Sequence, residues 1–340
     1  MLNIAAWPQN PTFWILVGFH VFVLLMLALD MGVLRKKSHV VGMKEAAGWT
    51  TFWVGLAALF AAGVYVWRGK EEGLQFVAGY VVELSLSVDN LFVFLVIFKY
   101  FSVPEHLRYR VLFWGILGAL VMRAVFILAG FSLLHYFEWI MYLFGAFLIY
   151  TGLSLLKAGD EEVDPERNWA LRLARRWFPL TDRFDSERFF IVEAGKRLAT
   201  PMFLVLLVIE STDVMFALDS IPAIFAISKD LFVVYTSNIF AVLGLRALYF
   251  LLAGFMGMFR YLNVGLAFVL VFVGIKMMIK EPVAFLNWPG FNIPIGWSLA
   301  AIAAILAASV FASLRAGPEK ADAHGSTPAA KNEPDSIKPE

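Results

Sequence analysis

The sequence contains no cysteine, and only 16% of its residues are charged. Without cysteine, disulfides, thiolate zinc sites, iron–sulfur clusters and cysteine nucleophiles are excluded. The charges nearly cancel, because 28 Lys and Arg residues oppose 27 Asp and Glu residues, so no nucleic acid or other highly charged macromolecular partner is expected. The charged fraction is also well below the roughly 25% of ordinary soluble domains, which excludes a chain of two or three such domains.

Apolar residues dominate instead, at 60% of the 340 residues with a mean hydropathy of +0.74. A helix needs about 20 mostly apolar residues to cross a bilayer, and lipid admits only helices or closed barrels. The apolar runs are too long and continuous for barrel strands, so we expect an all-α polytopic membrane protein with about nine transmembrane helices. The expected spans are residues 13–34, 46–67, 74–101, 108–131, 135–156, 201–228, 231–256, 261–279 and 294–314.

The positions of Lys and Arg predict the orientation of these spans. No basic residue precedes Arg35, so the first span lacks the positive region of a cleavable signal peptide and is expected to be retained. If the amino terminus is outside, most of the 28 basic residues fall on inside connections, as the positive-inside rule requires. We therefore expect the amino terminus outside and the carboxyl terminus inside.

The chain divides by composition into six parts. They are residues 1–73 with two helices, 74–157 with a first three-helix repeat, 158–200 as a cytoplasmic loop, 201–280 with a second three-helix repeat, 281–316 with the ninth helix, and 317–340 as a disordered tail. Within the loop, residues 168–179 place aromatic and aliphatic side chains among arginines. This pattern is typical of an amphipathic helix on an anionic inner leaflet, and a solvated cytoplasmic hairpin is an equal alternative.

An internal repeat relates the two three-helix units. Two carboxylates and an arginine recur in the same order on corresponding helices, and the third helices share a glycine. The matched pairs are Glu83 with Asp213, Asp89 with Asp219, Arg123 with Arg246, and Gly152 with Gly274. Three crossings per unit start the second unit from the opposite face, so the repeats are expected to be inverted, as in secondary transporters that bind substrate near the midplane.

Acidic residues within the apolar spans are the candidate functional groups. Each costs roughly 2.5–3.5 kcal/mol at a helix centre on the insertion scale, so several on matching helices indicate function. A single one of them could equally neutralise a buried base or cap a broken helix. The candidate metal ligands are Asp30, Glu83, Asp89, Asn90, Glu210, Asp213 and Asp219.

The spacing of these residues predicts local breaks. Glu83 and Asp89 are six residues apart, as are Asp213 and Asp219, which leaves their side chains about 120° apart on a straight helix. Since Pro222 also removes a helical hydrogen bond, we expect both helices to be interrupted near the sequences SVDN and LDSIP, where free carbonyls would add ligands.

Carboxylates, amides and carbonyls are hard oxygen ligands that suit Mg²⁺, Ca²⁺ or Mn²⁺. The intramembrane acids outnumber the bases Arg123, Arg246 and Lys276, so a divalent cation or protons would fill the deficit, which provides a basis for exchanging metal for protons. Arg123 and Arg246 would hold the empty site together, or alternatively pair with helix ends. His20 is expected to be a hydrogen-bonding residue and not a ligand.

Several segments closely resemble the TerC/Alx family of bacterial integral membrane proteins, over about residues 13–280. They are LALDMGVLRKKSHVV, VELSLSVDNLFVFLVIF, ATPMFLVLLVIESTDVMFALDSIPAIFAIS and YTSNIFAVLGLRALYFLLAG. The resemblance implies export of Mn²⁺ as transported substrate across the cytoplasmic membrane, with no bound cofactor, and implies that the family's acidic positions fall on the seven candidate ligands. The family is also associated with tellurite resistance, which we expect to be indirect, because an oxyanion would not choose an acidic pocket.

Two other classes of function remain as alternatives to the transporter. One is a membrane assembly or stress-response scaffold, in which the acidic motifs hold helices together and the basic loop from Asn168 docks a partner. The other is an intramembrane hydrolase that uses an Asp pair, but the GxGD arrangement, a serine–histidine pair and the HExxH motif are missing. We therefore expect a transporter that is driven by proton uptake or by the membrane potential, and not an enzyme.

Overall fold

The structure is a computed structural model that describes residues 11–34, 42–137, 139–158, 168–181, 188–193, 195–254, 261–280, 290–291 and 293–316, without the side chains of residues 11–13, 16 and 29–34. The helices are α1 (Pro11–Leu34), α2 (Met43–Arg68), α3 (Lys70–Tyr100), α4 (Glu105–Tyr136), α5 (Ile140–Ala158), α6 (Trp169–Trp177), α7 (Pro201–Ile227), α8 (Leu231–Leu243), α9 (Leu245–Ala253), α10 (Leu262–Lys280) and α11 (Ile295–Ala316). Two strands, β1 (Phe190–Glu193) and β2 (Lys196–Ala199), form an antiparallel hairpin.

The fold is an all-α membrane bundle, as expected, apart from this one small hairpin. Among the described residues, seven helices are long and apolar enough to cross a bilayer, namely α2, α3, α4, α5, α7, α10 and α11. The pair α8 and α9 would make an eighth crossing, bent by 41° at Gly244. The remaining expected span lies on α1, whose described apolar stretch, Val17–Ala28, is shorter than a full crossing.

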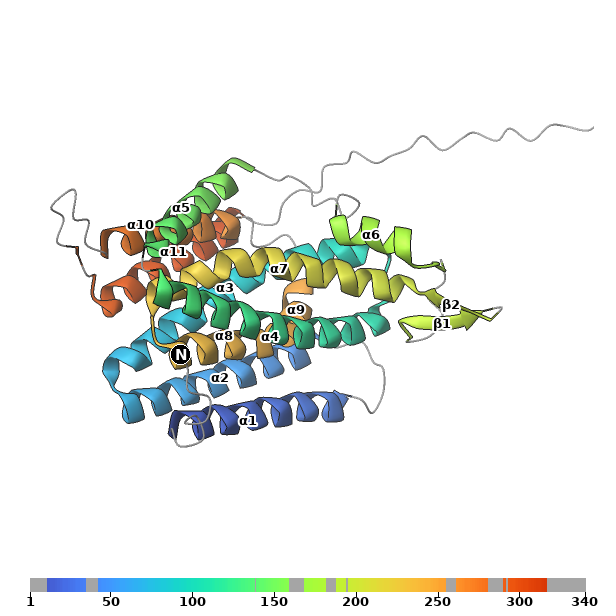
Figure 1. Cartoon of the computed structure of the whole chain (residues 1–340), viewed down its shortest axis with the longest axis horizontal. Coiled ribbons are helices and arrows are strands. Elements are labelled where there is room, and N and C mark those ends of the chain that lie inside the picture. Colours follow the sequence, from blue (N-terminus) through green and yellow to red (C-terminus); the bar gives the residue numbers. More distant parts are fainter. Residues whose placement is uncertain are drawn as a thin grey trace, which may run out of the picture.

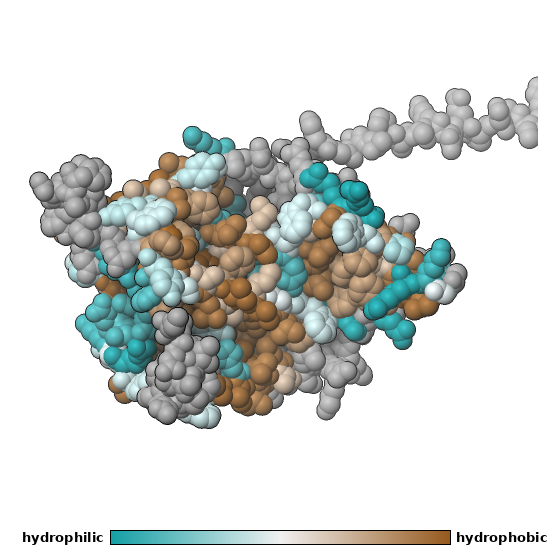
Figure 2. Space-filling model, viewed as in Figure 1, coloured by the Kyte–Doolittle hydropathy of each residue, from teal (hydrophilic) through white to brown (hydrophobic). Residues whose placement is uncertain are grey.

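The surface of the bundle is apolar between two hydrophilic ends (Figure 2). Large side chains such as Val66 and Leu59 are 85% and 70% exposed, which would promote aggregation in water but suits contact with lipid tails. We call the end with the α2–α3 connection the Gly69 end, and the end with the β1–β2 hairpin the hairpin end (Figure 1).

The central helices pack across the two units of the expected repeat (Figure 1). Helix α3 packs on α8, α4 packs on α7, and α5 packs on α10. Glycines allow α5 and α10 to approach each other closely. A Cβ on Gly152 of α5 would lie only 2.7 Å from the carbonyl oxygen of Ala267 on α10. A Cβ on Gly274 would lie 2.7 Å from the carbonyl oxygen of Gly145, so each helix places a glycine on a carbonyl of the other.

The predicted interruptions of α3 and α7 are wrong, because both helices are continuous. Hydroxyl groups bond within the continuous helices instead: Ser85 Oγ donates to the carbonyl of Val81, and Thr212 Oγ1 donates to that of Val208, both at 2.7 Å. Pro222 removes one donor inside α7, yet the helix continues to Ile227. The bend falls instead at Gly244, between α8 and α9.

The loop between the two units contains the helix expected over residues 168–179, observed as α6. Asn168 caps α6 by accepting hydrogen bonds from the amides of Ala170 and Leu171, at 2.9 and 3.3 Å. The buried face of α6, with Ala170 and Leu171, packs along α7, while Trp169 and Trp177 are exposed. The sequence analysis predicted either a helix on the membrane surface or a solvated hairpin, and neither interpretation predicted that α6 packs on α7. The expected tail, residues 317–340, lies outside the described residues.

Candidate site: buried carboxylates of α3 and α7

A fully buried ion cluster lies where α3, α4 and α7 meet. Arg123 on α4 forms an ion pair with Glu83 on α3, and its Nη2 lies 3.6 Å from Oδ1 of Asp213 on α7. The three residues are 0%, 1% and 3% exposed. Arg123 therefore bridges the two matched carboxylates and pairs with them instead of with a helix end.

The antiparallel course of the helices explains this convergence. Helix α3 runs from the Gly69 end toward the hairpin end, and α7 runs back, so Glu83 and Asp213 lie at similar depths near the middles of their helices. Asn238 on α8 accepts a hydrogen bond from Arg123 Nη1 at 3.4 Å. Two carboxylates and one guanidinium leave one net negative charge in a region without solvent. Such a cluster is stable only if all of its partners remain in place.

The cluster retains unused hydrogen-bonding capacity. Oδ2 of Asp213 and Nδ2 of Asn238 are buried and have no hydrogen-bond partner in the described part of the chain. The hydroxyl groups of Ser87 on α3 and Ser220 on α7 are likewise buried, with no hydrogen-bond partner in the described part of the chain. Because buried polar atoms in proteins are normally paired, each of these atoms is a place where water, a proton or an ion can bind.

Asp89 and Asp219 form a second acidic group. The two carboxylates lie close enough to repel each other, and both side chains are partly buried. Oδ1 of Asp219 accepts a hydrogen bond from Thr151 Oγ1 on α5 at 3.2 Å. Asn90 is buried on α3 beside Asp89. This group therefore offers two carboxylates together with the hydroxyl oxygen of Thr151.

Glu210 lies close to Asp213 on α7, and the two carboxylates also repel each other. The Glu210 carboxylate occupies the place that a Cβ on Gly118 of α4 would take. The next residue, Ser211, accepts a hydrogen bond at 2.9 Å from the Asn168 side-chain amide at the start of α6. Helix α6 thus reaches α7 one residue from Glu210.

The remaining residues that the sequence singled out are Arg246, Asp30 and His20. Arg246, at the start of α9 after the bend, is buried with its guanidinium 4.5 Å from the centre of the Tyr109 ring of α4. The side chain of Asp30 lies outside the described residues. His20 Nε2 lies 2.7 Å from the hydroxyl of Tyr235, which confirms its expected role in hydrogen bonding.

The structure thus distributes the described candidate ligands over neighbouring groups. In the described part of the chain, no three His, Asp or Glu side chains converge as a ready metal site. Sequence reasoning did not single out Thr151, Asn238 or Asn168 as partners of the carboxylates. The sequence did contain a signal for Thr151 and Asn238, because each is a polar residue within an apolar span.

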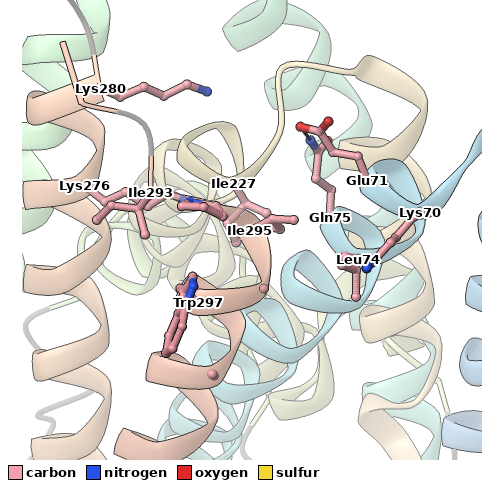
Figure 3. Close-up of a pocket in the computed structure, with 13 residues that line it drawn as sticks. Lys70, Glu71, Leu74, Gln75, Ile227, Lys276, Lys280, Ile293, Ile295 and Trp297 are labelled. Atoms are coloured by element: carbon pink, nitrogen blue, oxygen red, sulfur yellow. Dashed lines mark hydrogen bonds between the residues drawn. The ribbon is translucent and has the colours of Figure 1, made fainter.

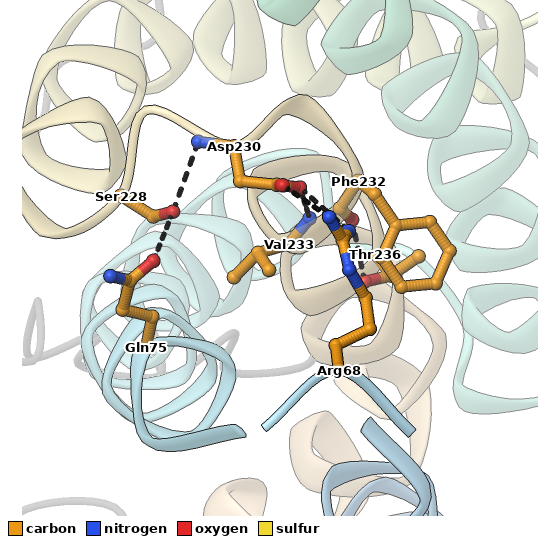
Figure 4. Close-up of polar contacts among 7 residues, drawn as sticks. All are labelled: Arg68, Gln75, Ser228, Asp230, Phe232, Val233 and Thr236. Atoms are coloured by element: carbon orange, nitrogen blue, oxygen red, sulfur yellow. Dashed lines mark hydrogen bonds and ion pairs between the residues drawn. The ribbon is translucent and has the colours of Figure 1, made fainter. Parts of the chain in front are cut away.

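Two cavities open at the Gly69 end, and none of the candidate ligands lines them. The larger, about 760 Å³, lies between α3, α10 and α11 (Figure 3), and the smaller, about 310 Å³, is lined by Phe131, His135 and Lys229 among others. A polar network closes the same end between α2 and α8 (Figure 4). In it Arg68 binds Asp230 through two hydrogen bonds of 3.1 and 2.7 Å.

Comparisons with known proteins agree with the membrane fold. The model of the integral membrane protein TerC family matches residues 68–320. An uncharacterized membrane protein from Myxococcus xanthus is 52% identical over 90% of this chain and 92% of its own. The Escherichia coli K12 protein named "Putative membrane-bound redox modulator Alx" is 46% identical over 87% of this chain and 92% of its own. No solved structure matches this chain.

Proposed function

The chain belongs to the TerC family of integral membrane proteins, and from that premise we propose that it exports a divalent metal cation, with Mn²⁺ as the substrate. The protein would be a transporter and not an enzyme. It would lie in the cytoplasmic membrane with the Gly69 end and the amino terminus outside and the hairpin end and the carboxyl terminus inside.

The observation that carries this proposal is the excess of acid between α3, α4 and α7. Glu83, Asp89, Glu210, Asp213 and Asp219 are buried or partly buried there, and Arg123 is the base seen among them. An excess of negative charge inside a membrane is costly unless a cation or protons compensate it. Hard oxygen ligands favour Mn²⁺, Mg²⁺ or Ca²⁺ over softer ions.

The packing supports an inverted repeat as the framework of transport. Helices α3 and α4 of the first unit pack on α8 and α7 of the second, and the glycine contacts of α5 and α10 are reciprocal. Transporters of this architecture place the substrate where the two units meet, and the acidic groups lie between α3 and α7.

We assign different roles to the two acidic groups. Asp89 and Asp219 are the primary ligands, because they are partly exposed and the hydroxyl group of Thr151 lies beside Asp219. Glu83 and Asp213 hold Arg123, whose positive charge stabilises the site when metal is absent. Proton uptake by the closely spaced carboxylates on metal release would couple export to the proton gradient.

The names of the relatives point to a redox effect, which fits metal export only as an indirect consequence. This chain has no cysteine, so it has no thiol of its own to exchange electrons. We attribute any redox phenotype to a changed concentration of intracellular Mn²⁺.

The test is Mn²⁺ flux into proteoliposomes with an imposed pH gradient, compared with flux of Mg²⁺. Asp89→Asn and Asp219→Asn each remove one negative charge from the proposed site. Each should reduce Mn²⁺ flux at least about tenfold, because a neutral amide binds a divalent cation more weakly than a carboxylate does. Both variants should keep the melting temperature of the wild type, since neither residue takes part in the Arg123 cluster.

A scaffold would give a different result. In that case the two substitutions would alter function only in proportion to lost stability, and purified protein would not transport metal. Wild-type Mn²⁺ flux through both variants would overturn the proposal. Asp230→Asn is a matched control, because Asp230 is an acidic residue at the Gly69 end that already binds Arg68.

A further inference from the structure

The cavity of about 760 Å³ at the Gly69 end is separate from the acidic groups (Figure 3). Its volume lies in the range of small-molecule sites, roughly 300–1,000 Å³. Its charged lining residues are Lys70 and Glu71 at the start of α3 and Lys276 and Lys280 at the end of α10. Among the described lining residues, three ammonium groups thus accompany one carboxylate, which is an excess of positive charge.

Lys276 is the most informative of these residues. Its side chain extends from α10 toward Ile227 and Ile295 in the cavity (Figure 3), and the residue is only 6% exposed. Within the described part of the chain its ammonium group has no hydrogen bond or ion pair, and another base, Lys280, lies close enough to repel it. A buried ammonium group is costly unless an anion accompanies it.

Glu71 is the one acid among the described lining residues, and it forms no ion pair with Lys276. Oε1 of Glu71 accepts a hydrogen bond from the side-chain amide of Gln75 at 3.3 Å, on the α3 side of the cavity. The amide oxygen of Gln75 in turn accepts from Ser228 Oγ at 2.5 Å (Figure 4). The side chains of Glu71 and Gln75 on α3 are therefore hydrogen-bonded to each other, and Gln75 is also bonded to Ser228, which follows α7.

The backbone adds further positive potential. Helix α11 begins at Ile295 in the cavity wall, and its first amides carry the partial positive charge of a helix amino terminus. Helix α3 begins at Lys70 in the same wall. A buried ammonium group and two helix amino termini thus meet around one cavity.

We propose that this cavity is a binding site for a phosphate-bearing anion, held by Lys276 and Lys280 with the first amides of α11. The apolar lining residues Leu74, Ile293 and Trp297 leave room for a hydrocarbon or glycerol portion beside the phosphate. Trp297 is 74% exposed at this end of the bundle, where tryptophan typically lies at the lipid headgroups. The phosphate could therefore come from an anionic phospholipid or from free phosphate.

The experiment measures the melting temperature of the purified full-length protein in two arms. One arm titrates inorganic phosphate against chloride at constant ionic strength in detergent. The other compares nanodiscs of phosphatidylcholine with nanodiscs that also contain phosphatidylglycerol. Saturating ligand should raise the wild-type melting temperature by at least about 2–4 °C in one of the arms, because a ligand that binds only the folded state stabilises it.

Lys276→Met should abolish this rise, because it removes the ammonium group and keeps an unbranched apolar chain. Lys229→Met is the matched control, since Lys229 is an exposed base at the same end outside this cavity, and it should keep the full rise. If Lys276→Met does not fold, Lys280→Gln is tested instead. It should raise the ligand concentration needed for the half-maximal rise in melting temperature at least about tenfold.

A response to phosphate alone identifies a soluble ligand, and a response to phosphatidylglycerol alone identifies a lipid. No response in either arm, or an equal response in all variants, overturns the proposal. Metal flux does not enter this measurement, so the result is independent of the proposed export of Mn²⁺.

Discussion

At the scale of single residues, the pairing of Arg123 with two carboxylates decides how the acidic core can be changed. A buried charge that loses its partner keeps the full cost of desolvation, whereas removal of a whole pair can be nearly neutral. Arg123, Glu83 and Asp213 are all nearly inaccessible, so solvent cannot replace a missing partner. Their effects on stability should therefore be strongly non-additive.

We predict that Arg123→Met destabilises the protein by about 3–5 kcal/mol, because it leaves Glu83 and Asp213 buried without their base. The double variant Arg123→Met with Glu83→Gln should recover a large part of that loss. Denaturant unfolding in detergent measures both. Lys99→Gln, an exposed base in the last turn of α3, should change stability by less than about 0.5 kcal/mol. Additive losses in the double variant would contradict the buried ion cluster.

Thr151 tests the second acidic group at the same scale. Its hydroxyl donates to Oδ1 of Asp219 across the α5–α7 contact, so we predict that Thr151→Val lowers Mn²⁺ flux about tenfold while the fold persists. Proteoliposome flux and the melting temperature are the measurements. Thr50→Val is the control, because Thr50 donates only to the carbonyl of Ala46 within α2 and should leave flux unchanged.

At the scale of helices, the sequence predicted more of the framework than of the contacts. Apolar length alone located the seven long helices of the described chain, and the recurrence of Glu83 and Asp213 predicted a meeting that the structure contains. Six-residue spacing did not predict helix breaks, because carboxylates on different helices can meet without any break. The sequence left open whether Arg123 pairs with these carboxylates or with a helix end, since the choice depends on how α4 lies between α3 and α7.

The α5–α10 contact is the element-scale feature most sensitive to a single methyl group. A Cβ at Gly152 would meet the backbone oxygen of Ala267 at 2.7 Å, and backbone atoms cannot move aside as a flexible side chain can. We predict that Gly152→Ala destabilises the protein by about 1–3 kcal/mol, as overpacking usually does. Thermal unfolding measures this loss, and Gly274→Ala should behave alike because its contact with Gly145 is equivalent.

Gly63→Ala on α2 provides the control for these glycines. Nothing lies within 4 Å of a Cβ at that position, so the substitution should be neutral or stabilise the helix by about 0.5–1 kcal/mol. A similar loss from all three substitutions would indicate that helix flexibility, and not close packing of α5 on α10, explains the effect.

At the scale of the whole molecule, the two ends of the bundle differ in chemistry. The hairpin end holds β1, β2 and the basic helix α6, whereas the Gly69 end holds the Arg68–Asp230 pair and the proposed anion cavity. Positive residues are retained on the cytoplasmic side of a membrane when they lie in short loops. The basic residues of α6, Arg172, Arg175 and Arg176, therefore favour a cytoplasmic hairpin end.

This orientation can be tested directly because the chain has no cysteine, so each introduced thiol is the only one present. We predict that a membrane-impermeant maleimide labels Tyr136→Cys in intact cells and labels Glu193→Cys only after the membrane is permeabilised. Both positions are exposed, Tyr136 at the Gly69 end of α4 and Glu193 at the tip of β1, so packing within the protein does not limit the reaction at either. The opposite pattern would place the hairpin outside, and the direction assigned to Mn²⁺ export would then have to be reversed relative to the helices. Labelling of both in intact cells would mean that the two ends do not lie on opposite sides of the membrane.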